Sequence, residues 1–169
     1  MKSRLILTLL TFLTFSFVVS ADQTTNQVRS NVQVELPKLI VELGDILPVI
    51  AGSGDLTIPQ EQKDALRVVT GKLSEFFLHG LAVNDMHTML AMVKSKKARA
   101  EAWGAYELQM QDYHQKPMGE ILNEVDRQLQ ILKPPVSGHA SKARRVAKEA
   151  FQLINAAKLS DFETRYDRE

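Results

Sequence analysis

The feature that most constrains this chain is the spacing of its apolar residues, which recur in steps of three and four along most of its length. This spacing places apolar side chains on one face of an α-helix. No segment alternates with a period of two over a convincing length, and Val, Ile and Thr do not cluster between turn signals as they do in strands. The pattern therefore predicts an all-α fold.

The apolar stripes give the approximate extent of each expected helix. Stripes occupy Leu36–Ile50, Leu66–Phe76, Met118–Leu132 and Val146–Ala157. A long segment from Met86 to about His114 is apolar at both ends and basic in the middle. Four or five amphipathic helices of this length can close around one core, so we expect a small helical bundle. The same spacing also fits an extended helical hairpin, or a dimer of antiparallel chains.

Glycine, proline and capping residues predict where these helices begin and end. The glycine-rich segment 51–55 predicts a turn, and Thr57 a helix start after it. The pair Asn84-Asp85 predicts a break, with Asp85 capping the next helix. Pro134-Pro135 stops a later helix, and we expect the turn Val136-Ser137-Gly138 to follow.

Residues 1–21 have the pattern of a cleavable export signal. Lys2 and Arg4 precede an apolar run from Leu5 to Val19, and small residues lead to the polar Asp22. The run is shorter than the roughly 20 residues that a membrane-spanning helix needs. We therefore expect cleavage near Ala21-Asp22, and a periplasmic or secreted protein without a permanent membrane anchor.

Composition narrows the class of the remaining chain. Residues 22–32 are polar and aperiodic and predict a flexible N-terminal arm, followed by a single helical domain over 33–169. The chain has 21 basic and 20 acidic residues, a balance that gives no support for nucleic-acid binding. It has no cysteine, so an exported domain of this sequence must be stabilised by packing rather than by disulfides.

A short motif occurs twice. The first copy, 56–60, spells LTxxQ, and the second copy, 159–163, has Ser and Glu in place of Thr and Gln. A Thr or Ser three residues before Gln or Glu is also a capping box, so both copies predict helix starts. The motif residues are Leu56, Thr57, Gln60, Leu159, Ser160 and Glu163.

An exported, cysteine-free helical chain with these two motifs resembles the LTxxQ-motif proteins, the Spy and CpxP group of periplasmic stress proteins. The resemblance covers residues 54–169. It implies a cradle-shaped helical dimer that acts in envelope stress, as an ATP-independent chaperone or as the partner of a membrane sensor. It also implies unfolded or envelope proteins as partners, and some members of the group bind metal.

A basic segment followed by aromatic residues is the candidate partner surface. Basic clusters beside apolar stripes suit weak binding of unfolded clients. The same basic residues also fit solvated helix faces, and the aromatic stripe, which continues to Met110 and Tyr113, also fits a helical core. The candidate surface consists of Lys94, Lys96, Lys97, Arg99, Trp103 and Tyr106.

Methionine and histidine form the second candidate constellation. Five of the six methionines lie between Met86 and Met118, with His79 one or two turns before them. Thioether and imidazole ligands together suit Cu(I), provided that the segments around 86 and 114 meet. Methionines at helical spacing also serve as core residues, so we expect no cofactor by default, with copper as the alternative. The candidate ligands are Met86, His87, Met89, Met110 and His114.

Signatures of enzymes are missing from the sequence. No Gly-rich phosphate loop, zinc-protease motif or dinucleotide fingerprint occurs, and Ser53 between two glycines lacks the strand that a nucleophile elbow needs. The sequence thus predicts an exported, non-enzymatic binding protein, an envelope-stress accessory or chaperone of LTxxQ type. The alternatives are a periplasmic copper-binding protein and a structural or assembly partner with no ligand.

Overall fold

The computed structural model describes residues 31–55 and 57–163, which form helices and no strand. The predicted signal peptide, residues 22–30 of the predicted arm, and Leu56 lie outside the described residues. The elements are α2 (Asn31–Gly52), the 3-10 helix η1 (Ser53–Asp55), α3 (Gln60–Met92), α4 (Lys96–Met110), the π-helical segment η2 (Gln111–Gln115), α5 (Lys116–Leu129), α6 (Val136–Ala156) and the 3-10 helix η3 (Leu159–Phe162).

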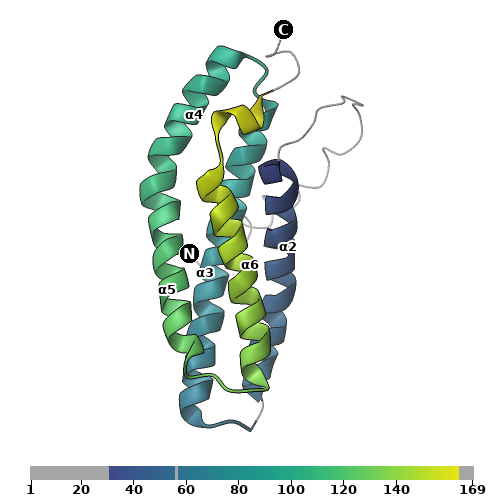
Figure 1. Cartoon of the computed structure of the whole chain (residues 1–169), viewed down its shortest axis with the longest axis vertical. Helices are drawn as coiled ribbons and strands as arrows, with labels where there is room; N and C mark the ends of the chain where they lie inside the picture. The colour runs from purple at the N-terminus through teal and green to yellow at the C-terminus, as the bar shows by residue number, and fades with distance from the viewer. Residues whose placement is uncertain (1–30, 56, 164–169) are drawn as a thin grey trace, which may run out of the picture.

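The described helices form an up-and-down bundle, so the prediction of an all-α helical bundle is confirmed (Figure 1). The segments α4, η2 and α5 follow one another without a break and form one long rod, which runs antiparallel to α3. Helix α3 packs against both α2 and α5, and α6 closes the ring against α2 and α5. None of the described helices is long and apolar enough to cross a membrane.

The core is one cluster of apolar side chains contributed by all of the long helices. The predicted stripe of α2 is buried, and Leu36, Leu43 and Ile50 are fully enclosed. Each such side chain contributes about 1.5–3 kcal/mol of burial free energy. Helices α2 and α3 approach closely at Gly80, where an added Cβ would lie 2.3 Å from the Cδ1 of Ile40. Glycine is therefore a packing requirement at this crossing.

Helix α3 is one continuous helix from Gln60 to Met92, so the predicted break at Asn84-Asp85 is wrong. The buried stripe of α3 continues past this pair, and its packing outweighs a local capping tendency. The break lies instead at Val93–Ser95. The backbone N–H of Ala98 donates to the Ser95 hydroxyl at 3.3 Å, which makes Ser95 the N-cap of α4.

Both predicted capping boxes are also wrong. Helix α3 begins at Gln60 after Pro59, without a side-chain cap, because a residue that precedes proline is disfavoured in helical backbone. The amide of Gln60 donates instead to Asp64 at 3.0 Å. Near the C-terminal end, the carboxylate of Asp161 accepts from the backbone N–H of Lys158 at 2.8 Å, so η3 begins before Ser160.

Prolines do not always end the helices of this chain. Pro37 and Pro48 both lie inside α2. Pro117 lacks the N–H that would continue the α-helical ladder, and the π-helical segment η2 directly precedes this region. The predicted turn after Pro134-Pro135 is wrong, because Val136 is buried in the core and starts α6.

Candidate functional site

Two histidine contacts join α3 to the antiparallel rod beside it. The Nδ1 atoms of His79 in α3 and His114 in η2 are 3.1 Å apart. The Nε2 atom of His87 in α3 lies 2.6 Å from the hydroxyl oxygen of Tyr106 in α4. The two contacts fit one antiparallel register, because eight residues separate His79 from His87 on α3 and eight separate Tyr106 from His114 on the other rod. Eight residues of helix correspond to roughly 12 Å.

The His79–His114 contact is only half-buried. Its rings meet edge to face, with centroids 5.3 Å apart and planes at 85°. At the observed Nδ1–Nδ1 distance, one imidazole donates its N–H to the lone pair of the other, so at least one ring is neutral. Burial, together with the neighbouring His79, lowers the pKa of His114. The contact therefore holds an imidazole lone pair near the surface.

The π-helical segment η2 shapes this contact. In a regular α-helix, residues four apart drift around the axis by roughly 40° per step. Tyr106 and His114, which contact α3, recur in steps of four with the buried Met110 and Met118. A wider π-helical turn compensates for this drift. It thereby keeps His114 in line with Met110 and Met118, which are both buried.

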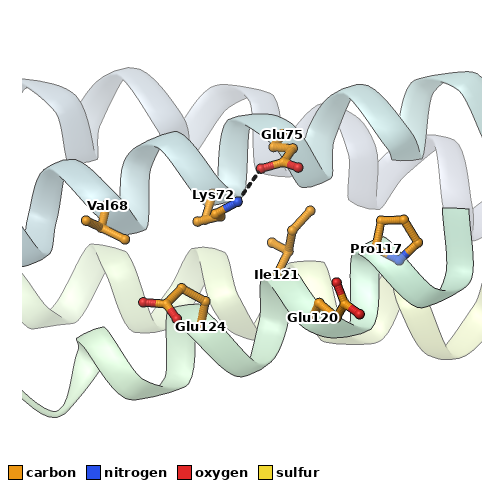
Figure 2. A pocket seen from close by; sticks show the side chains of 7 residues that line it. All are labelled: Val68, Lys72, Glu75, Pro117, Glu120, Ile121 and Glu124. Carbon is orange, nitrogen blue, oxygen red and sulfur yellow. Dashed lines mark hydrogen bonds and ion pairs between the residues drawn. The ribbon is translucent and has the colours of Figure 1, made fainter. Parts of the chain in front are cut away.

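A groove of about 330 Å³ continues along the same seam between α3 and α5 (Figure 2). Glu75 lies four residues before His79 on α3, and Pro117 lies three residues after His114, so the groove starts about one turn from the histidine contact. The ammonium of Lys72 donates to Glu75 at 2.7 Å. Of the three carboxylates that line the groove, Glu75 pairs with Lys72 and Glu124 pairs with Arg127. With Glu120 as the third, the groove carries a small net negative charge, which favours cations weakly. The lining residues are Val68, Lys72, Glu75, Pro117, Glu120, Ile121 and Glu124.

The second contact belongs to an aromatic cluster that we define as His87, Trp103, Tyr106 and Phe162. The His87 ring lies 4.9 Å from Phe162, and Trp103 lies 4.8 Å from Tyr106 and 5.7 Å from Phe162, measured between centroids. His87 is 3% exposed and Phe162 is fully buried. The cluster ties η3 to α3 and α4, and so seals one end of the bundle.

Burial sets the protonation of this cluster. It lowers the pKa of His87 to about 4, so the imidazole is neutral at neutral pH. Burial, and secondarily the charge of Glu107, raises the pKa of Tyr106. The Nδ1 atom of His87 has no hydrogen-bond partner among the described residues. Because the His87 imidazole is neutral and enclosed, a ligand has no access to it, and we interpret it as a structural group.

The predicted copper ligands do not come together around His87 and His114. The antiparallel register places His114 beside His79 and His87 beside Tyr106, so the segments around 86 and 114 do not meet. Met89 is exposed, Met86 half-buried and Met110 buried. Among the described residues, no three His, Asp or Glu side chains are grouped closely enough to hold a metal ion. His79, which the sequence indicates only as a neighbour of the methionines, is the residue that contacts His114.

The predicted partner surface is only partly at the surface. Lys94, Lys96 and Lys97 are exposed around the α3–α4 connection, and Trp103 is half-buried. Arg99 is 1% exposed and Tyr106 is 7% exposed, so their predicted surface positions are wrong. The guanidinium of Arg99 donates to the carbonyl of Val93, at the end of α3, and thereby closes the turn between the two helices.

The outer face of α3 carries exposed apolar side chains. We define the outer stripe as Leu78, Leu81, Met89 and Met92, which are 65%, 37%, 67% and 66% exposed. At 100° per residue they fall within a sector of roughly 80°, with Asp85 in its middle. The stripe ends next to the exposed lysines of the α3–α4 connection. Sequence periodicity missed it, because a stripe of this spacing also fits the core.

The two LTxxQ-like copies lie at opposite ends of the bundle, one at the α2–α3 connection and one in η3 (Figure 1). Thr57, Gln60 and Ser160 are exposed, and Leu159 and Glu163 are half-buried. The copies therefore do not combine into one site.

Comparisons of the chain with family models, with curated proteins and with solved structures give no match. The function of the chain therefore has to be inferred from the chemistry of its own residues. Three places carry it: the half-exposed His79–His114 contact beside the acidic groove, the sealed aromatic cluster, and the outer stripe of α3 with its lysines.

Proposed function

We propose that this chain is an exported, non-enzymatic binding protein that acts as an ATP-independent chaperone in envelope stress, the role implied by its resemblance to the LTxxQ-motif proteins. The observation that supports this proposal is the outer stripe of α3. Its four side chains are exposed although the bundle has a complete core of its own. Apolar surface that a core does not use is a common feature of binding sites.

The chemistry of the stripe suits clients that differ in sequence. Methionine has a flexible, polarisable side chain that adapts to many partners, and Met89 and Met92 are among the most exposed apolar residues described. The lysines at 94, 96 and 97 add positive charge at one end of the stripe. Such charge speeds the encounter with acidic segments and is weakened by salt. Weak, salt-sensitive holding of unfolded chains follows from this combination.

The test is the aggregation of a chemically denatured client, followed by light scattering with and without the protein. The wild-type chain should slow aggregation, and the triple variant Leu78→Gln/Met89→Gln/Met92→Gln should lose most of this effect. Exposed substitutions typically change stability by within about 0.5 kcal/mol, so the variant should keep its melting temperature.

The matched control is Leu108→Gln, since Leu108 is 79% exposed on α4 and does not belong to the stripe. It should slow aggregation as well as the wild type does. A wild-type chain that protects no denatured client would rule out the chaperone proposal. Equal protection by the triple variant and the wild type would rule out the stripe as the binding surface.

A further inference from the structure

We propose that His79 and His114 form a binding site for a divalent transition-metal ion of the copper or zinc class. This site is independent of the chaperone proposal and lies on another face of α3. It rests on the distance between the two ring nitrogens, on the helix irregularity that holds one of them, and on the acidic groove beside them.

The two Nδ1 atoms already have the spacing of metal ligands. They are 3.1 Å apart and come from two different rods, so the packing of the bundle holds them in place. Imidazole nitrogens bind zinc at roughly 2.0–2.1 Å. For an ion at that distance from both Nδ1 atoms, the nitrogen–metal–nitrogen angle would be about 100°. This angle lies between the square-planar and tetrahedral values that copper(II) and zinc adopt.

Binding requires that the two rings give up the hydrogen bond between them and turn, so that both Nδ1 lone pairs point to one ion. In the neutral pair, one Nδ1 carries a proton and donates it to the other Nδ1. When an ion binds, that proton leaves for solvent and the Nε2 atom of the same ring takes one up. Both rings stay neutral, each Nδ1 offers its lone pair, and no net proton is released.

The local backbone points to the same place. Isolated π-helical turns are rare and occur frequently at functional sites. The segment Gln111–Gln115 includes His114, and the wider turn keeps this residue facing α3. The buried methionines Met110 and Met118 stand one turn before and one turn after His114.

The surroundings provide attraction and an open side. The contact is half-buried, so an ion can reach it from solvent and keep water as further ligands. The acidic groove begins about one turn away, with Glu75 on the same face of α3 as His79. After the ion pairs of Glu75 and Glu124 are counted, the groove keeps a small net negative charge, which attracts cations weakly. The aromatic cluster has none of these properties, because His87 is enclosed.

The site is tested by titrating the full chain separately with Cu(II) and Zn(II), using calorimetry for affinity and native mass spectrometry for stoichiometry. The wild type should bind one ion per chain. Removing a residue that only orients a metal ligand typically lowers the metal affinity by roughly 10–100-fold. Removing a ligand itself should cost at least as much, so His79→Ala and His114→Ala should each lower the affinity by about 100-fold or more. In the Cu(II) form, electron paramagnetic resonance should show two coordinated nitrogens.

The matched control is His139→Ala, because His139 is an exposed histidine on α6. It should bind like the wild type. Circular dichroism checks the fold of each variant, and His79→Gln and His114→Gln replace any alanine variant that does not fold. Binding of either ion with this pattern supports the site and identifies the class of ion. Wild-type chain without stoichiometric binding of either ion, or unchanged binding by both histidine variants, would overturn the proposal.

Discussion

Two histidine contacts on the same pair of rods, eight residues apart, have opposite characters. At His87 a third element, η3, places Phe162 over the imidazole, and the ring is buried and held near the Tyr106 hydroxyl. At His79 the described chain places no such cover, and the ring meets a second histidine at the edge of an acidic groove. The first contact is suited to holding the fold together, and the second to holding a ligand.

Helical register alone therefore does not set the role of a histidine in this bundle. Both residues lie on the face of α3 that meets the neighbouring rod. Burial removes hydration from the charged form and so favours neutral imidazole, which lowers the pKa of His87 to about 4. The covering element therefore determines whether the imidazole is a closed structural group or an accessible base.

The largest effect should come from removing the cover. Phe162→Ala deletes a fully buried ring that contacts both His87 and Trp103. Truncating a buried Phe costs about 3–5 kcal/mol of unfolding free energy. Urea denaturation measures this loss, with Leu108→Ala as an exposed control that should change stability by within about 0.5 kcal/mol. A loss near that of the control would show that η3 does not seal the bundle.

The second effect is a loss of stability in acid that is specific to His87. Its pKa is about 4 in the folded chain and 6.5 in the unfolded chain, so the unfolded chain binds the extra proton between these values. The contribution of His87 to the free energy of unfolding should therefore be fully present above pH 6.5. It should fall by about 3 kcal/mol as the pH drops toward 4.

This acid sensitivity is measured by chemical denaturation of the wild type and of His87→Gln across the same pH range. The variant cannot titrate at this position, so its stability should decline less steeply with acid. His139→Gln, on an exposed face of α6, is the control and should follow the wild type. Parallel curves for His87→Gln and the wild type would mean that His87 is not held neutral by burial.

The smallest effect should come from the open contact. His79→Leu removes one half-exposed hydrogen bond and should cost about 0.5–1.5 kcal/mol. His87→Leu leaves the buried Tyr106 hydroxyl without its partner and should cost more, about 1–3 kcal/mol. Thermal unfolding of the two variants side by side gives the order. The reverse order would invalidate the contrast between a structural and a ligand-competent histidine.

Much of the fold was predictable from local spacing, and much of the candidate site was not. The stripe Leu36–Ile50 predicted the buried face of α2, because side chains three and four apart share one side of a helix. The break at Val93–Ser95 was missed, since the pair Asn84-Asp85 carries the stronger local capping signal. Arg99 was expected at a surface because charge usually stays hydrated, yet the turn between α3 and α4 encloses it.

Local spacing was enough to predict that the described chain is helical and which face of α2 is buried, because both follow from the repeat of apolar residues. Tertiary structure alone decided which helices meet, and in what register. That choice set His114 against His79 and His87 against Tyr106, and placed Phe162 over only one of the two contacts. A periodic stripe encodes burial, whereas the identity of the neighbouring helix depends on how distant segments pack together.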